Sequence, residues 1–441
     1  MSRPGMHRVY QTLLDGVPNS DWLRATSRIE NERRAVDQYL ESPQSHAYGF
    51  TTLLGHLDGI EMTRTEQAVV LESHLIEPSW QAPSQLRNLL LACKIEQLHH
   101  GGSGIHKDSY RSLLDALEQS CRPIRGNWSA SYGSGDVIPA AWLMQDLREF
   151  DESSLLEHSG DLITLINGHY ISTAFGIATA AVLTKHLGVF LEEWLPHCAR
   201  PSNGLPAPLR DLLDQFLPAQ PNQTRQPPVS MRDPTPVLKT MVRTVSRLGE
   251  SVESRLQTPS ANPLWAVSTG QAQPQSQASF LDFNLSFDLA AAIELVGLIG
   301  GLWQRLIEHT CADIGKQEGA HVPVQPPKAA QVVVDRMTGA GNSPRRFTGQ
   351  ESQGVEDLRD MSLQLTLTLH TQLTELDNLQ QIWQQLRAKY NQPARSSEGS
   401  FGRRFLEIFL GCSQDTFSNV DAEQLLQTLE VACSGLNSQM A

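Results

Sequence analysis

Long apolar runs constrain the fold of this 441-residue chain more than any other feature of its sequence. Residues 160–194 are nearly all apolar, residues 287–306 form a second such run, and residues 357–390 carry many leucines mixed with glutamines. A helix that is hydrophobic all round has to be buried all round. Strand signals are scarce, so the sequence predicts an all-α fold, a long-helix bundle whose cores lie inside a large assembly. Shorter helices are predicted over residues 20–41, 66–75, 84–98 and 108–119.

Irregular stretches divide the chain. Residues 199–236 are rich in Pro, Asn and Gln, and residues 316–350 are similarly irregular. Loops of this length in a compact fold are usually functional or disordered. A shorter break follows at residues 392–399. We therefore predict an N-terminal, loop-rich active-site region over residues 1–160, a central long-helix bundle over 161–390, and C-terminal helices over 391–441.

Composition excludes several classes of function. The net charge of −13 opposes nucleic acid and anionic membranes as partners. The N-terminus has no apolar segment typical of a secretory signal, and the longest apolar run, residues 171–183, is shorter than the roughly 18 residues of a membrane span. The six cysteines are scattered without a CxxC pair, and the histidine pairs lack partners at metal-ligand spacing. We expect a cytoplasmic protein with neither a metal nor a nucleotide cofactor.

The tetrapeptide Gly133-Ser134-Gly135-Asp136 allows two interpretations. Glycines on both sides of a serine leave the backbone unusually free, which suits a tight loop before a helix. Alternatively, the Gly135 nitrogen attacks the Gly133 carbonyl carbon, and loss of water closes a five-membered ring. Loss of the Ser134 hydroxyl would then leave a methylidene, an electrophile that no standard side chain supplies. A serine-hydrolase elbow does not fit, because the order is not G-x-S-x-G and no strand precedes it.

The surrounding segment, RGNWSASYGSGDVIPAAWLMQD, resembles the Ala-Ser-Gly-Asp-Leu-x-Pro-Leu-Ala stretch of the aromatic amino acid ammonia-lyases and aminomutases. That family forms the methylidene-imidazolone (MIO) group. Residues 48–57 (YGFTTLLGHL) are similar to the family's Tyr-Gly-Val-x-Thr-Gly-Phe-Gly-x-Leu loop, which implies Tyr48 as the general base and Leu53 beside the substrate. A phenol has a pKa of about 10, so this role requires positive potential nearby, such as helix N-termini. The alternative is an ordinary tyrosine in a turn.

Two further stretches follow in the family's order. Residues 165–169 (LINGH) resemble Leu-Ile-Asn-Gly-Thr, which implies that Asn167 supports the prosthetic group and the substrate, with Asp136 as a second support. A structural cap at a helix junction is the other interpretation of Asn167. Residues 85–91 (QLRNLLL) resemble a pocket helix in which Ser-His follows, whereas Cys93 stands here in place of the histidine. The lost imidazole disfavours a histidine-type substrate.

The chain departs from the family where the substrate carboxylate is bound. Thr235 stands at the position of a second catalytic tyrosine, and Leu238 at that of a carboxylate-binding arginine. Leucine cannot replace a bidentate guanidinium. Either a neighbouring cation takes over this role, or the substrate has no free α-carboxylate. The neighbouring cations are Arg232, Lys239 and Arg243.

Two other positions bear on the site. Gly133 replaces the usual alanine, a change that ring formation tolerates because the ring uses the carbonyl carbon and not the side chain. Gln350-Glu351 falls where the family carries Gln-Glu before its last long helix, which implies that Glu351 faces the active site.

Three functions remain open. The first is a divergent carbon–nitrogen lyase or aminomutase acting on an amino acid or derivative, with MIO formed from Gly133-Ser134-Gly135. The second is an enzyme repurposed on the same scaffold, with or without the ring, for a carrier-protein-bound or otherwise carboxylate-masked small molecule. The third is a catalytically silent scaffold subunit. The resemblance implies the fumarase/aspartase-like helical fold and a homotetramer whose active sites draw on several subunits.

Overall fold

The computed structural model describes residues 3–119, 122–150, 155–198, 213, 226–318, 323–342, 345–390, 400–411 and 419–434. Within these ranges the chain is helical, with short two-stranded antiparallel sheets, which confirms the all-α prediction. Nearly all of the predicted connection over 199–225, and the predicted break over 392–399, lie outside the described residues. The division into three regions with boundaries at 160/161 and 390/391 remains a prediction.

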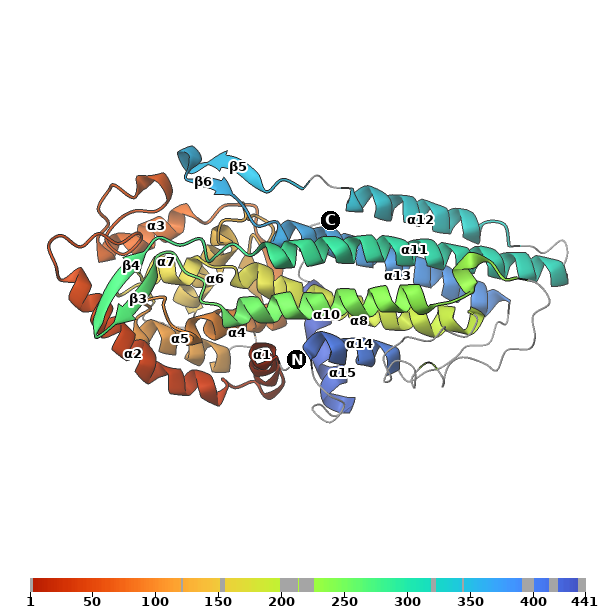
Figure 1. Cartoon of the computed structure of the whole chain (residues 1–441), viewed down its shortest axis with the longest axis horizontal. Coiled ribbons are helices and arrows are strands. Elements are labelled where there is room, and N and C mark those ends of the chain that lie inside the picture. The colour runs from red at the N-terminus through yellow and green to blue at the C-terminus, as the bar shows by residue number, and fades with distance from the viewer. Residues whose placement is uncertain are drawn as a thin grey trace.

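Long helices form the body of the molecule (Figure 1). Helices α8 (Tyr170–Trp194), α10 (Thr235–Gln257), α11 (Phe283–Glu318) and α13 (Ser362–Lys389) lie side by side along its longest axis. Helix α12 (Pro326–Gly341) packs on α11 and α13, while α14 (Ser400–Leu410) and α15 (Asn419–Ser434) pack on α8. Because α8 contacts helices on every side, it is apolar all round and almost entirely buried.

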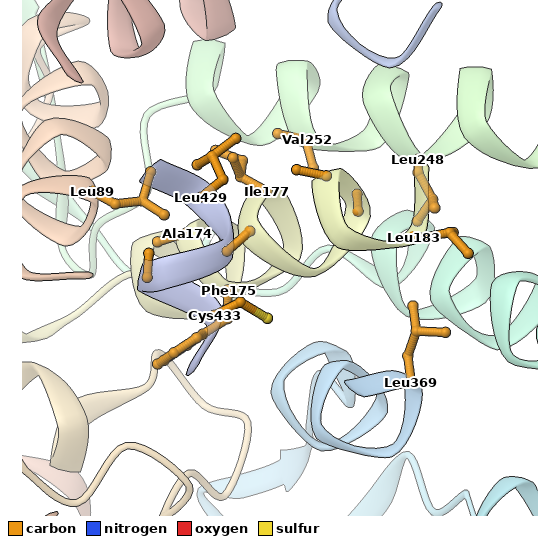
Figure 2. Close-up of a cluster of buried hydrophobic side chains, with 14 of the residues drawn as sticks. Leu89, Ala174, Phe175, Ile177, Leu183, Leu248, Val252, Leu369, Leu429 and Cys433 are labelled. Atoms are coloured by element: carbon orange, nitrogen blue, oxygen red, sulfur yellow. The ribbon is translucent and has the colours of Figure 1, made fainter. Parts of the chain in front are cut away.

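The core around α8 draws side chains from distant parts of the sequence (Figure 2). Each large apolar side chain buried there stabilises the fold by about 1.5–3 kcal/mol relative to an exposed one. The contributors include Leu89 of α4, four residues of α8 (Ala174, Phe175, Ile177 and Leu183), two of α10 (Leu248 and Val252), Leu369 of α13, and Leu429 and Cys433 of α15.

The N-terminal region covers one end of the bundle, at the left of Figure 1. The four helices predicted there are confirmed with shifts of no more than two residues at an end. The region contains α1 (Pro4–Asp15), α2 (Ser20–Leu40), α3 (Gln67–Ser73), α4 (Ser84–His99), α5 (Lys107–Gln119), α6 (Val137–Phe150) and α7 (Asp161–Ile166). Strands β3 (Leu264–Ser268) and β4 (Gln271–Gln275) form a hairpin, as do β5 (Thr348–Glu351) and β6 (Glu356–Leu358). Strand β1 (Trp80–Ala82) pairs antiparallel with β2 (Ile124–Gly126), which follows it only after α4 and α5.

Two predictions about the later helices are wrong in part. The stretch 316–350, predicted to be irregular, contains helix α12. Its two prolines fall in the first turn, where a missing N–H costs no hydrogen bond. The helix predicted over 357–390 begins only at Ser362, because strand β6 occupies the preceding residues.

The apolar run 160–194 is a pair of helices rather than one. Helix α7 ends at Ile166, Asn167 is extended, and Gly168 has a φ of +129°. That conformation is accessible to glycine and strained for other residues, so the chain turns here before α8 begins.

The expectation that no apolar run is long enough for a membrane span is wrong. By length and composition alone, segments Asp161–His197 and Phe283–Lys316 are long and apolar enough. In this structure 83% and 67% of their most apolar windows are buried against the rest of the chain, as expected for core helices of a bundle.

Candidate active site

The Gly133-Ser134-Gly135 loop connects β2 to α6 and has an unusual backbone. Gly133 has a φ of +100° and Gly135 a φ of +91°, and Asp136 follows with a φ of +51°. A Cβ atom on Gly133 would lie 2.1 Å from the carbonyl oxygen of Asp360. Glycine at position 133, where the family has alanine, is therefore required by close approach of another backbone segment.

Asp136 fastens this loop to the bundle. Its carboxylate accepts hydrogen bonds from Ser131 Oγ at 2.6 Å and from the main-chain N–H of Ser172 at 3.0 Å. Ser172 lies in the first turn of α8, whose N-terminal N–H groups favour a negative charge. Burial nevertheless raises the pKa of Asp136, and the charge of Asp360 adds to this effect. The predicted substrate-binding carboxylate is thus engaged in holding the loop.

The β5–β6 hairpin and the residues after it cover the loop. Asp360 donates its main-chain N–H to the Gly133 carbonyl oxygen at 2.9 Å. Ser134 is buried, and its Oγ makes one long hydrogen bond, 3.4 Å, to the Leu358 carbonyl oxygen. The serine hydroxyl is therefore weakly held while the backbone around it is tightly held.

Asn167, in the break between α7 and α8, faces the loop. Its main-chain oxygen accepts a hydrogen bond from Lys94 Nζ at 3.0 Å. A Cβ atom on Gly135 would lie 3.0 Å from Asn167 Nδ2, so the two groups are in direct proximity. Asn167 Oδ1 is buried and has no hydrogen-bond partner in the part of the chain described here. An unpaired buried amide oxygen costs about 1–3 kcal/mol, and at a concave site it is typical of a position that a ligand completes.

Tyr48 lies in the loop between α2 and α3. Its hydroxyl oxygen accepts a hydrogen bond from the Gly55 N–H at 2.7 Å, which favours the phenolate. Burial outweighs this bond and raises the pKa of Tyr48, and the charge of Glu356 raises it further. The positive surroundings expected for a tyrosine base are thus not supplied by this chain's described residues. Leu53 is partly buried in the same loop, where its N–H donates to the Ile60 carbonyl oxygen at 2.9 Å.

The charge of Glu356, a residue that sequence reasoning missed, raises the pKa of Tyr48, as does the charge of Asp58. Glu351, the predicted residue, is exposed at the end of β5 and lies opposite Glu356 in the hairpin. Glu356 is partly buried, and burial raises its pKa. A second glutamate nearby in the sequence, Glu356, could have been considered as the site residue. The pairing of the hairpin strands, which places Glu351 and Glu356 opposite each other, cannot be read from the sequence.

Thr235 lies far from the Ser134 and Asn167 loops within a single chain. Thr235 begins α10, and the segment before it is bonded to the far end of α8, where Trp194 Nε1 donates to the Ser230 carbonyl oxygen at 3.0 Å. The 25 residues of α8 span about 37 Å, and Asn167 precedes the other end of this helix. Cys93 is fully buried in α4, and burial raises the pKa of its thiol.

Two groups of described side chains offer three possible metal ligands each. In the first, the ligand atoms lie within 4.8 Å of one another and the two imidazoles stack with centroids 3.3 Å apart. In the second, the carboxylate is already bonded to Arg8 and to the indole of Trp22. The groups are His106, Asp108 and His158, and Glu96, His99 and His100.

Comparison with known proteins finds similarity in the N-terminal region. Residues 7–148 match the family model described as aromatic amino acid lyase. The histidine ammonia-lyase of Alkaliphilus oremlandii is 24% identical over 179 residues, which cover 35% of this chain and 35% of that protein. The match therefore spans about a third of the length of this curated relative.

The fold as a whole is shared with solved structures. Ergothionase from Treponema denticola superposes with a TM-score of 0.71 at 14% identity, covering 97% of both chains. Tyrosine aminomutase from Streptomyces globisporus superposes with a TM-score of 0.66 at 14% identity, covering 98% of this chain and 96% of that one. The chain therefore has the fold of these solved structures, and its residues 7–148 match the aromatic amino acid lyase family model.

Proposed function

We propose that the chain is a carbon–nitrogen lyase or aminomutase that eliminates or migrates an amine of an amino acid or a derivative. The observation that carries the proposal is the Ser134 loop, held in a conformation that only glycines allow and facing the unpartnered Oδ1 of Asn167. Relatives named as ammonia-lyase, aminomutase and ergothionase support the reaction class.

The residues present fit an MIO group formed from this tripeptide. Gly133 and Gly135 have the backbone freedom that ring closure needs, and Ser134 Oγ is weakly bonded and free to leave. Asn167 Oδ1 is a buried acceptor beside Gly135 that still lacks a donor among the described residues. When formed, the group would supply an electrophile that captures the substrate amine and improves it as a leaving group.

Side chains of the site then have separable roles. Tyr48 in its ionised form, whose negative charge the Gly55 N–H stabilises, removes the β-proton of the substrate and becomes a neutral phenol. Glu356, whose charge acts on Tyr48 and whose raised pKa favours the protonated form, is proposed to hold or protonate a polar group of the substrate. Asn167 orients the amine, and Asp136 keeps the loop in place.

The assembly is proposed to be a homotetramer in the cytoplasm. Thr235 and its neighbouring cations lie at the opposite end of α8 from Asn167, so they reach an active site only in another copy of the chain. Phe287 and Leu298 are exposed on the otherwise mostly buried helix α11, where a second copy of the chain is suited to cover them. With leucine at position 238, a substrate without a free carboxylate, free or carried on a protein, is the second candidate.

The mass of the tryptic peptide Gly126–Arg148 tests the proposal, because this peptide has no internal Lys or Arg. We expect a deficit of two water molecules in the wild-type protein and no such deficit in the Ser134→Ala variant. Ser129→Ala, in the same peptide, is the matched control and should retain the deficit. An unmodified wild-type peptide would exclude the MIO mechanism and leave the ring-free and silent alternatives.

A further inference from the structure

A buried arginine connects the ends of several helices beneath the Ser134 loop. Arg255, near the end of α10, is fully buried and pairs with the Asp360 carboxylate. The same guanidinium donates to Ser362 Oγ at 2.8 Å, at the start of α13, and to the Asp282 carbonyl oxygen at 2.5 Å, just before α11. It also donates to Ser172 Oγ at 3.0 Å, in the first turn of α8.

Both carboxylate oxygens of Asp360 accept hydrogen bonds from neighbouring residues. Its Oδ1 accepts hydrogen bonds from Ser286 Oγ and from the Ser362 N–H, both at 2.7 Å, while Oδ2 takes the Arg255 bond. With the side chain fixed in this way, the main-chain N–H points at the Gly133 carbonyl oxygen at 2.9 Å.

These contacts form one hydrogen-bond network that holds both ends of the Gly133-Ser134-Gly135 tripeptide. One end is held through Gly133 by Asp360, and the other through Asp136 by the N–H of Ser172. Arg255 bonds both residues that hold the tripeptide: it donates to the carboxylate of Asp360 and to the hydroxyl of Ser172. A buried ion pair is weak evidence for a gain in stability, because desolvation offsets the attraction, whereas it does fix geometry.

The Gly133 carbonyl is the group on which ring formation acts. The Gly135 nitrogen bonds to the Gly133 carbonyl carbon, and the π electrons move to the carbonyl oxygen, which also receives the proton of the Gly135 nitrogen. That oxygen leaves as water with the proton of the Ser134 nitrogen, which gives a C=N bond between Gly133 and Ser134. A second water takes the Ser134 hydroxyl and its Cα hydrogen. No oxidant or reductant is needed.

We propose that Arg255 is a positioning residue for this maturation step: it holds Asp360 so that its N–H stabilises the negative charge that develops on the Gly133 oxygen. A donor preorganised at such an oxygen is worth about 10²- to 10³-fold in rate. The role rests on the proposed function, because it concerns formation of the same prosthetic group.

The test follows the appearance of the two-water deficit in peptide Gly126–Arg148 over time after cell-free synthesis. Arg255→Met should slow ring closure by about 100-fold or more. Arg255→Lys keeps the buried charge but lacks the fork that reaches Asp360 and Ser172 together, and it should slow closure by about tenfold. Arg247→Met is the matched control, because it removes an ion pair to Asp288 from the same helix and should close at the wild-type rate.

Folding is monitored separately by circular dichroism and thermal unfolding. Should Arg255→Met fail to fold, the charge-conserving Arg255→Lys variant decides. A folded Arg255→Lys protein that closes the ring at the wild-type rate overturns the role of Arg255 and leaves the proposed function intact. A wild-type protein without the deficit overturns both.

Discussion

The protonation state of buried Lys94, which bonds to the site residue Asn167, can be tested through the pH dependence of stability. It is fully buried on α4, donates its Nζ to the Asn167 carbonyl oxygen at 3.0 Å, and lies 4.7 Å from the centre of the Tyr170 ring. Burial lowers the pKa of Lys94 from 10.5 to about 7. The site's asparagine is therefore held by a lysine that is mostly neutral above neutral pH.

The pKa difference between the unfolded and folded states sets the size and sign of the contribution of Lys94 to stability as pH changes. A drop from 10.5 to about 7 corresponds to about 5 kcal/mol between the protonation states. Between pH 7 and 10.5 the unfolded chain binds this proton and the folded chain does not, so Lys94 makes stability rise with pH across that window. Lys94→Met removes this dependence, but it leaves the Asn167 oxygen without its donor, at a cost of about 1–3 kcal/mol.

We therefore expect Lys94→Met to be more stable than wild type by about 2–4 kcal/mol at pH 6, and less stable by about 1–3 kcal/mol near pH 10.5. Urea unfolding followed by circular dichroism at fixed protein concentration measures the difference, since other titrating groups cancel. Lys107→Met, which removes a partly exposed pair with Glu30, is the control and should show no such crossover. A difference that stays constant from pH 6 to 10.5 would refute the reasoning, because Lys94 would then be charged in the folded protein.

Other predictions concern the loop and the hairpin. Gly133→Ala, although it introduces the family's usual residue, should lower the melting temperature and slow ring closure, because its Cβ meets the Asp360 oxygen at 2.1 Å; wild-type melting and closure would contradict the close approach. Because the pKa of Tyr48 is raised, kcat/KM on an identified substrate should keep rising with pH up to about 10, and a plateau near pH 8 would argue against Tyr48 as the base. Tyr48→Phe should lose about 10²- to 10⁴-fold in kcat. Glu356→Gln should lower kcat/KM at least about tenfold and Glu351→Gln less than about twofold, and the reverse order would restore the original choice of glutamate.

Local sequence pattern was enough to predict most helices, and the family resemblance selected the Ser134 and Asn167 segments. Sequence pattern placed α2, α4 and α5 within two residues of their observed ends, although α5 buries one face and α4 is buried almost all round. The resemblance selected Ser134 and Asn167, and the structure brings their loops into contact.

What the sequence did not reveal depends on pairing between distant or very short segments. The choice between Glu351 and Glu356 depends on a two-stranded hairpin of three- and four-residue strands, too short for a periodic signal. The need for Gly133 comes from the backbone of Asp360, which no local rule connects to it. The separation of Thr235 from the site follows from the length of α8 and its antiparallel return through α10, a property of the bundle rather than of any motif.

The partners of the Ser134 loop set the order of events during synthesis. Ser134 bonds to a carbonyl 224 residues later, and the Ser131 carbonyl oxygen to Gln364, 233 residues later. At roughly 5–20 residues per second, a ribosome needs about 12–50 s after making the loop to make the segments that shape it. The N-terminal third carries Gly133-Ser134-Gly135, whereas the partners that shape this loop lie at residues 358–364, so a chain interrupted before residue 348 lacks these contacts.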